Sequence, residues 1–333
     1  MDSLRLSQIA GRFAGQRILV AGDLMLDEFL WGRVSRISPE APVPVVDVTS
    51  ESYYPGGAAN VARNVREFTT ATELMGVAGT DSHGDRLLGL LREGGIDTGA
   101  VERDAARSTT VKTRVIARHQ QVVRVDRERR TSLTPAETEL AIGHLRRRIA
   151  HLDGIIVADY GKGFLTQTLA DAICAIAGEH GKILTVDPHP HTSLVWRGAT
   201  AIKPNRAEAF LAAGLAPSDP DSPALDRDAV TEAGRRLLGI WQTRSLLITL
   251  GERGMVLFES GRAPYHTPTR AKDVFDVSGA GDTAIAVLTL ALCAGASPAE
   301  AAELANLASG IAVGKLGTAT VTMAELEAGL ADA

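Results

Sequence analysis

The chain has 333 residues, of which 45% are hydrophobic and 23% charged, a balance typical of a globular protein that buries a large core. Its 40 acidic and 35 basic residues give a formal charge of -5, which provides no positive field for a polyanion, so we predict no nucleic-acid partner. The N-terminus lacks the continuous apolar block of a signal peptide, and the most apolar run (284–296) is too short to cross a bilayer. Only two cysteines occur, which fits a reducing compartment. We therefore predict a cytoplasmic protein with no membrane partner.

Short runs rich in Ile, Val and Leu alternate with amphipathic helical segments along the chain. We predict strands at 17–22, 73–79, 154–159, 182–187, 199–203 and 245–250. Their order predicts a mainly parallel sheet, and the absence of polar alternation within them predicts that helices cover both faces. We therefore expect a single three-layer α/β domain over residues 1–333.

Two stretches interrupt this alternation of strands and helices. Residues 43–48, and 111–117 together with 121–126, alternate apolar with polar side chains, as half-exposed antiparallel strands do. We interpret these stretches as a small β-sheet lid, built from about 31–50 and 109–127.

Asp23 and Asp27 follow the first predicted strand. The carboxyl end of such a strand borders the ligand crevice of an open α/β sheet, where carboxylates can accept hydrogen bonds from hydroxyl groups of a ligand. The alternative is a turn-forming aspartate without a ligand, and this alternative fits Asp27 better than Asp23.

Gly56 and Gly57 precede an amphipathic helical segment at 58–68. Asn60 lies near the start of this helix, off its apolar stripe. Its amide could bond a hydroxyl group of a ligand or act as a local helix cap, and both interpretations remain open.

The most informative motif is Asp-Val-Ser-Gly-Ala-Gly-Asp-Thr at 276–283, just before a long apolar helix. The free N–H groups of a helix N-terminus, together with the helix dipole, can hold an anion such as a phosphoryl group in transfer. Asp282, in the first helical turn, is then a candidate base for the attacking hydroxyl. Alternatively, the glycines only turn the chain and Asp282 stabilises the helix N-terminus.

The motif at 276–282 resembles the C-terminal signature of the PfkB/ribokinase carbohydrate kinases, and residues 55–64 are similar to the N-terminal Gly-Gly signature of that family. The resemblance implies a three-layer ribokinase-like fold, ATP and Mg²⁺ as cofactors, in some members a monovalent cation such as K⁺, and a homodimer formed through the lid sheet.

Three further blocks, at 35–45, 119–126 and 159–163, resemble the D-glycero-β-D-manno-heptose 7-phosphate kinases. This resemblance implies phosphorylation of the anomeric hydroxyl of that sugar phosphate to the 1,7-bisphosphate, for ADP-heptose and lipopolysaccharide core synthesis. The chain lacks the His-x-Gly-His element of the bifunctional relatives, so we expect a stand-alone kinase.

The resemblance also implies roles for individual residues. Asp282 would be the catalytic base, and the N–H groups of Gly279, Ala280 and Gly281 would hold the phosphoryl group. The sugar would contact Asp23, Asp27, Gly56, Gly57 and Asn60, and its phosphate would need cations, for which the candidates are Arg114, Arg124 and Lys162. The nucleotide side would comprise Asp187, Lys203, Asn205, Glu208, Thr249, Gly251, Gly254 and Asn306.

Mg²⁺ would be met by Glu208 through water and by Asp187. Each of these assignments has a local alternative. Asn205 and Glu208 also have the spacing of a helix capping box, Gly251 and Gly254 could simply form a hairpin turn, and a helical asparagine such as Asn306 is usually solvated.

Some positions depart from the family pattern. His189 and Pro190 stand where relatives often have Lys-Gly, which puts a cationic role there in doubt. Two other functions remain open: a PfkB-type kinase of a phosphofructose, ribose or nucleoside, or a catalytically silent sugar- or nucleotide-binding regulator on the same fold.

Overall fold

The computed structural model describes residues 2–332 except 119, 217–222, 272 and 316. Among these residues, nine strands form one sheet in the order β13-β12-β11-β10-β9-β8-β1-β4-β5. Their bounds are β13 Tyr265–Thr267, β12 Met255–Glu259, β11 Ser245–Thr249, β10 Ala201–Ile202, β9 Ile183–Asp187, β8 Gly154–Ala158, β1 Arg17–Gly22, β4 Ala71–Gly79 and β5 Asp97–Asp104.

The sheet confirms the predicted parallel core. All six predicted strands are present, and the pairings from β10 through β5 are parallel. The strands β5, β12 and β13 were not predicted from the sequence. The last two add an antiparallel hairpin to the sheet edge next to β11.

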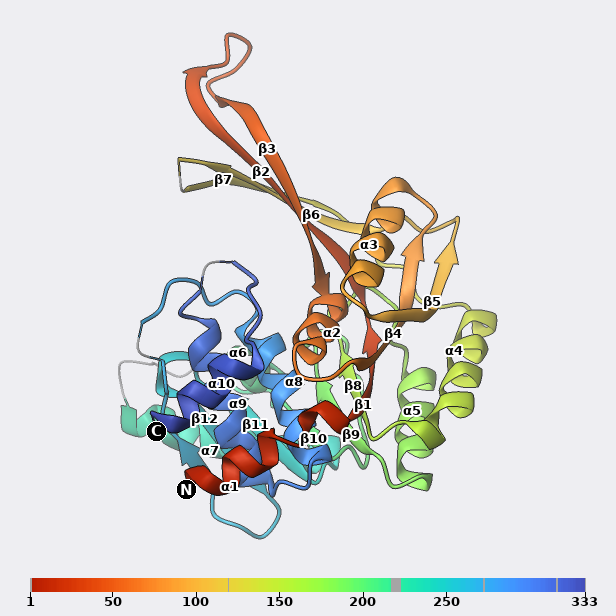
Figure 1. The fold of residues 1–333 in the computed structure, drawn as a ribbon, viewed down its shortest axis with the longest axis vertical. Coiled ribbons are helices and arrows are strands. Elements are labelled where there is room, and N and C mark those ends of the chain that lie inside the picture. The colour runs from red at the N-terminus through yellow and green to blue at the C-terminus, as the bar shows by residue number, and fades with distance from the viewer. Residues whose placement is uncertain (1, 119, 217–222, 272, 316, 333) are drawn as a thin grey trace.

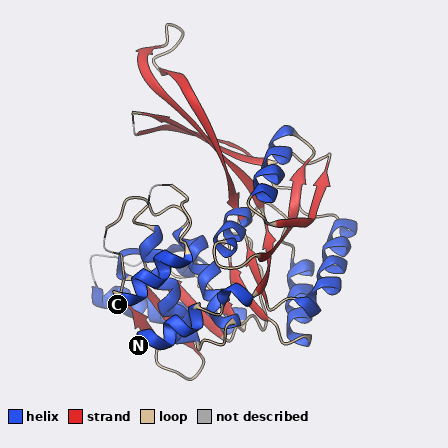
Figure 2. Cartoon of the chain, viewed as in Figure 1, coloured by secondary structure: helices blue, strands red, loops and turns tan. Residues whose placement is uncertain are grey.

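Helices cover both faces of this sheet (Figure 2). Their bounds are α1 Ser3–Ala10, α2 Ala58–Arg66, α3 Ser82–Glu93, α4 Pro135–Arg148, α5 Gln167–Glu179, α6 Arg206–Ala212, α7 Pro223–Trp241, α8 Ala280–Cys293, α9 Pro298–Ala312 and α10 Met323–Ala331. Short 3-10 turns occur at Phe13–Gly15, Ile149–His151 and Gly251–Arg253.

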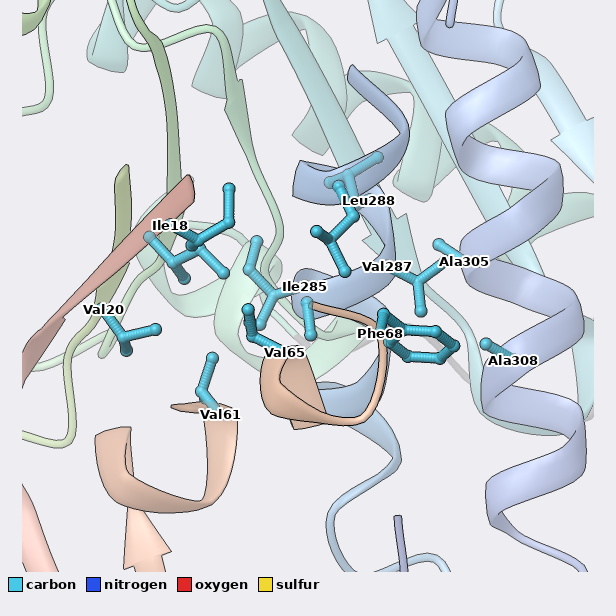
Figure 3. Packing of buried hydrophobic residues seen from close by; sticks show 14 of the residues in the cluster. Ile18, Val20, Val61, Val65, Phe68, Ile285, Val287, Leu288, Ala305 and Ala308 are labelled. Carbon is cyan, nitrogen blue, oxygen red and sulfur yellow. The ribbon is translucent and has the colours of Figure 1, made fainter. Parts of the chain in front are cut away.

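Successive residues of β1 show how the layers are formed. Ile18 and Val20 pack against α2, α8 and α9 in one hydrophobic core, part of which is drawn in Figure 3. Leu19 and Ala21 lie in a second core, formed with α4, α5 and α7. Because side chains alternate along a strand, a strand that is apolar at every position must be buried on both faces, as the three-layer prediction required.

The second sheet has four strands in the order β3-β2-β6-β7, and it is the predicted lid. Its strands are β2 Leu24–Ile37, β3 Pro44–Gly57, β6 Thr110–Ala117 and β7 Gln120–Arg127. Figure 1 shows β2 and β3 extending as a long arm away from the body. The predicted turn residue His119 lies outside the described residues.

Two details of the lid prediction were wrong. The β2–β3 arm starts at Leu24 and returns as far as Gly57, so it is longer than the predicted 31–50. The reason is that the inner part of β2 is buried and shows no polar alternation. In addition, β2 pairs with β6 in parallel, so the sheet is mixed rather than wholly antiparallel.

The arm positions the predicted sugar residues. Leu24 pairs with Gly57, and Asp27 pairs with Tyr54, so the residues after β1 lie beside the start of α2. Gly22 pairs with Ala158 at the ends of β1 and β8. The carboxyl ends of these strands therefore meet the glycine pair at one edge of the sheet. Among the described residues, no helix is long and apolar enough to span a membrane.

Candidate active site

The first turn of α8 begins where the sequence predicted. Gly279 is the N-cap residue and has a φ of 81°, a left-handed conformation that favours glycine. A Cβ at this position would lie 3.3 Å from Nδ2 of Asn60. Backbone N–H groups in a first helical turn lack intrahelical acceptors and are available to an anion. Glycine at this position thus allows the Asn60 amide to lie close to the start of α8.

Asp282 is fixed by hydrogen bonds from two other elements. Asn60 of α2 donates through Nδ2 to Oδ2 over 2.6 Å, and the hydroxyl of Tyr160 donates to Oδ1 over 2.6 Å. Burial raises the pKa of the Asp282 carboxyl, while the two hydrogen bonds and the charge of Lys203 act in the opposite direction. A carboxylate that is oriented and has a raised pKa is suited to accept a hydroxyl proton.

Asn60 does not cap its helix, because Gly57 is the N-cap residue and no side-chain cap bond is present there. Its Oδ1 instead accepts a hydrogen bond from Nη1 of Arg63 over 3.2 Å. The structure thus gives Asn60 a positioning role toward Asp282. Its contact with a sugar hydroxyl stays a prediction.

Tyr160 is the site residue that sequence reasoning missed. It lies two residues after the end of β8, at the edge of the sheet where the ligand crevice is expected. Burial and the neighbouring Asp282 carboxylate raise the pKa of its hydroxyl well above the ordinary value, so the hydroxyl remains a donor. Its position just after the carboxyl end of a predicted strand is the sequence feature that could have identified it as a site residue.

Lys203 and Asp187 form a buried ion pair beside α8. Nζ of Lys203 lies 3.0 Å from Oδ1 of Asp187, and the lysine side chain is only 3% exposed. A Cβ at Gly281 would lie 3.4 Å from the same Nζ, so the ammonium group faces the first turn of α8. The lysine adds a full positive charge to the partial charge of the helix N-terminus.

The pKa values of this pair follow from burial and from the surrounding carboxylates. Burial raises the pKa of the Asp187 carboxyl to about 7, although Lys203 opposes the rise. Burial acts to lower the pKa of Lys203, but the charges of Asp187 and Glu208 outweigh it and the net shift is upward. Lys203 therefore stays charged in the site.

Asn205 and Glu208 form the capping box that was the local alternative. The N–H of Asn205 donates to Oε2 of Glu208 over 2.7 Å, and the N–H of Glu208 donates to Oδ1 of Asn205 over 2.9 Å. Within the described part of the chain, no group of three or more His, Cys, Asp or Glu residues could hold a metal ion. The capping box is thus observed, and the binding of Mg²⁺ by Glu208 through water stays a prediction.

Three further residues predicted to contact the nucleotide lie at the β11–β12 hairpin. Thr249 ends β11 and bridges to Asn205, and Gly251 and Gly254 form the turn with φ values of 61° and 82°. A Cβ at Gly254 would lie 2.1 Å from the carbonyl oxygen of Thr267. The hairpin alternative is thus observed, and it leaves a nucleotide contact of these residues as a prediction.

Asn306 is not solvated, contrary to the alternative for a helical asparagine. It is 3% exposed, and Nδ2 donates to Oγ1 of Thr267 over 3.0 Å and to the carbonyl of Pro268 over 2.6 Å. These bonds tie α9 to the end of β13. Asn306 therefore helps to hold the end of β13 against α9. Its contact with the adenine ring stays a prediction.

Asp23 and Asp27 have different surroundings. The Asp23 carboxylate accepts hydrogen bonds from the backbone N–H groups of Tyr160, Lys162 and Phe164, over 2.9–3.0 Å. It is 3% exposed, so its visible role is to hold the loop at 160–164. A direct contact between Asp23 and the sugar stays a prediction.

Burial is the main cause of the raised pKa of the Asp282 carboxyl, and the charge of Asp27 acts in the same direction. A Cβ at Gly56 would lie 2.5 Å from Oδ2 of Asp27, and Gly57 has a φ of 59°. The glycine pair thus admits the Asp27 carboxylate close to the backbone. Asp27 is itself paired with Arg114, and its contact with the sugar stays a prediction, as it does for Asp23.

The three cations predicted to hold the sugar phosphate each have a carboxylate partner. Arg114 pairs with Asp27 over 2.5 Å, Arg124 with Asp126 over 2.9 Å, and Lys162 with Glu128 over 2.6 Å. The structure places Arg124 on the exposed strand β7. Arg114 and Arg124 lie opposite each other on β6 and β7, and Lys162 lies in the loop after β8. Their binding of the sugar phosphate stays a prediction.

Residues 16–325 match the model of the pfkB family of carbohydrate kinases. The chain belongs to this family. Two curated relatives are each called Bifunctional protein HldE. The one from Desulfatibacillum aliphaticivorans is 45% identical over 96% of this chain and 64% of its own length. The one from Geobacter metallireducens is 46% identical over 92% of this chain and 61% of its own length. The pfkB-family chain thus spans less than two thirds of these relatives.

Solved structures give the same fold at low sequence identity. The Arabidopsis thaliana ribokinase complexed with ribose and ATP covers 95% of this chain and 98% of its own, with a TM-score of 0.70 at 16% identity. The Escherichia coli phosphofructokinase-2 in complex with potassium also covers 95% and 98%, with a TM-score of 0.74 at 17% identity. The ribokinase-like α/β fold expected for this pfkB-family chain is confirmed.

Proposed function

We propose that this pfkB-family kinase transfers the γ-phosphoryl group of ATP to the anomeric hydroxyl of D-glycero-β-D-manno-heptose 7-phosphate. The product would be the 1,7-bisphosphate, made in the cytoplasm for ADP-heptose and lipopolysaccharide core synthesis. The kinase part of the proposal rests on one observation: Asp282, held by Tyr160 and Asn60, lies at the N-terminus of α8. The heptose part rests on the sequence blocks at 35–45, 119–126 and 159–163 and on the identity to the HldE relatives.

Different residues of the chain have different roles in the transfer. Asp282 takes the proton of the attacking hydroxyl, and its raised pKa makes it an effective base once ionised. The N–H groups of Gly279, Ala280 and Gly281, with the ammonium of Lys203, stabilise the charge that develops on the phosphoryl oxygens. The sugar is oriented by Asp23, Asp27, Asn60 and the Gly56–Gly57 backbone.

The charged groups of the site fit a nucleotide together with its metal ion. Lys203 and the α8 N-terminus offer positive charge, whereas Glu208 and Asp187 offer carboxylate oxygens, which Mg²⁺ prefers, often through water. Bound ATP and Mg²⁺ would supply the phosphoryl group and neutralise its charge. The chain's part is to align the acceptor and to exclude water, a task for which the lid is placed.

We also infer that the lid sheet pairs with its copy in a second molecule. Its strands and the β2–β3 loop carry a group of exposed large apolar side chains, namely Trp31, Ile37, Val43, Val48, Tyr54, Val122, Val123 and Val125. An arm that leaves such side chains in water gains free energy when a partner covers them. Mass photometry should give twice the chain mass for the wild type and a single chain mass for Val123→Asp; a wild-type monomer would contradict the dimer.

The proposed activity is tested by acceptor profiling. The protein is incubated with ATP and Mg²⁺ and with the heptose 7-phosphate, fructose 6-phosphate, ribose or a nucleoside, and ADP formation is measured with K⁺ or Na⁺ as the monovalent cation. We expect the highest kcat/KM with the heptose 7-phosphate and a new anomeric phosphate signal by ³¹P NMR. A higher kcat/KM with another acceptor would assign that substrate, and no sugar-dependent turnover would indicate the regulator alternative.

A further inference from the structure

The polar side of α2 lies against the start of α8. Asn60, Arg63 and Asn64 are three and four residues apart, so their side chains share one side of the helix. Asn60 and Asn64 are buried, and Arg63 is half-buried. Asn60 donates to Asp282 over 2.6 Å. The roles of Arg63 and Asn64 follow from their contacts with Asn60.

Asn64 fixes the position of Asn60 relative to α8. Its Nδ2 donates to the backbone carbonyl of Asn60 over 2.9 Å, and its Oδ1 accepts a hydrogen bond from the hydroxyl of Thr283 over 2.7 Å. Thr283 directly follows Asp282 and is also buried. A shift of either helix would leave these buried polar groups unsatisfied, which is unfavourable. The two helices are thus held in the register that brings Asn60 opposite Asp282.

The rotation of the Asn60 amide is the freedom that this register leaves. The amide has a donor side and an acceptor side, and a half-turn exchanges them. Its Nδ2 faces the Asp282 carboxylate, and its Oδ1 accepts from Nη1 of Arg63 over 3.2 Å. The reverse orientation would place the amide oxygen against the carboxylate and the amide N–H groups against the guanidinium. Because an arginine only donates hydrogen bonds, Arg63 favours the orientation in which Asn60 donates to Asp282.

The guanidinium of Arg63 is itself held in place. It lies over the ring of Tyr54, 5.9 Å from the ring centre. Burial lowers the pKa of Arg63, and the charges of Glu67 and Asp27 oppose this shift, so the arginine keeps its charge and its donors. Tyr54 belongs to β3 of the lid. The guanidinium therefore contacts the lid arm as well as the amide of Asn60.

We propose that Arg63 is a positioning residue for the phosphoryl transfer, which holds the Asn60 amide in the orientation that donates to Asp282. The inference rests on the proposed role of Asp282 as the base. Tyr160 holds Oδ1 of this carboxylate and Asn60 holds Oδ2. A carboxylate that is oriented before the sugar binds needs no reorganisation during the transfer. Loss of Arg63 should thus release one of the two carboxylate oxygens.

The orientation of the Asn60 amide can be measured without turnover. The chain has four asparagines, Asn60, Asn64, Asn205 and Asn306, so ¹⁵N labelling of the asparagine side chain gives four amide signals by NMR. The signal that is lost in Asn60→Ala belongs to Asn60. We expect one of its protons at low field in the wild type, because it is bonded to a carboxylate, and a shift to higher field in Arg63→Met. An Asn60 signal at the same position in both proteins would overturn the proposal.

The control is Arg66→Met. Arg66 is half-buried on the same helix, but its Nε donates to the carbonyl of Gly95, in the turn after α3, over 3.2 Å. This variant should leave the Asn60 signal unchanged. The other three asparagine signals check that each variant is folded. Arg63→Lys keeps a charged donor and should restore part of the low-field shift.

The kinetic test asks whether Arg63 acts through Asn60. Arg63→Met should lower kcat for sugar-dependent ADP formation by about 10-fold, because an oriented hydrogen bond to a charged group is lost. In the Asn60→Ala background the same substitution should lower kcat by less than about 2-fold. Equal losses in the two backgrounds would mean that Arg63 acts through its charge and not through the amide, and would overturn the proposal.

The two tests separate this inference from the proposed function. If Asp282→Asn keeps the turnover of the wild type while Arg63→Met shifts the Asn60 signal, the proposed base is wrong and the orientation of the amide by Arg63 stands. If Asp282→Asn loses turnover while Arg63→Met changes neither the Asn60 signal nor kcat, the base stands and the role of Arg63 is overturned.

Discussion

Substitution of Tyr160 by phenylalanine removes one hydrogen bond from Asp282 and leaves the ring in place. The Tyr160 hydroxyl donates to Oδ1 of Asp282 over 2.6 Å, and this bond acts to lower the pKa of the carboxyl against the effect of burial. A hydrogen bond to a charged group contributes about 1.5–3 kcal/mol, and one pKa unit corresponds to about 1.4 kcal/mol. The pKa of Asp282 should therefore rise by about 1–2 units in the variant.

The pH profile of kcat/KM for the sugar measures this shift, because its acidic limb reports the ionisation of the free enzyme's base. We expect the limb to move to higher pH by about 1–2 units in Tyr160→Phe, with activity recovering at alkaline pH. The control is Tyr265→Phe, since the Tyr265 hydroxyl donates to Oε1 of Glu303 over 2.7 Å, away from Asp282. An acidic limb at the same pH in Tyr160→Phe and the wild type would refute the assignment of Asp282 as the base.

Two further predictions concern the backbone at α8 and the stability of the site. Gly279→Ala places a Cβ 3.3 Å from Nδ2 of Asn60 at a φ of 81°, whereas Gly295→Ala, at the other end of α8, has a φ of 83° and nothing within 4 Å. Both substitutions should lower the free energy of unfolding, measured by urea denaturation, by about 1–2 kcal/mol. Only Gly279→Ala should also lower kcat. Equal losses of kcat in the two variants would contradict a role of the α8 N-terminus in the transfer. Burial raises the pKa of Asp159 to about 6 from 3.8, so the folded state keeps a proton that the unfolded state has lost, and stability falls as pH rises through this window. Over pH 4 to 6 the wild type should lose about 2 kcal/mol more than Asp159→Asn in urea denaturation, and parallel pH dependences would show that this carboxyl is not the cause.

The sequence predicted those parts of the molecule that depend on local pattern. Continuous apolar runs identified the inner strands, and Gly279 with Asp282 located the start of α8. The edge strands β5 and β13 were missed because their exposed positions carry polar residues, which weaken the apolar pattern. The inner strand β12 is a short buried apolar run, and it was missed although it fits the pattern used for the other strands. The lid arm was underestimated since its inner half is buried like a core strand.

The contacts within the site could not be predicted, because they join distant parts of the chain. Tyr160 and Asp282 are 122 residues apart, and Asp23 holds a loop that begins 137 residues later. The pairing of Arg114 with Asp27 depends on the parallel register of β6 with β2, which no local pattern specifies.

The transfer step itself is tested most directly by Asp282→Asn. The asparagine keeps the size of the side chain but cannot accept the hydroxyl proton, so the account predicts folded protein that binds ATP and sugar phosphate as the wild type does, measured by calorimetry. Its kcat for sugar-dependent ADP formation should fall by about 1,000-fold or more. Turnover near the wild-type value, with both substrates bound, would contradict the account.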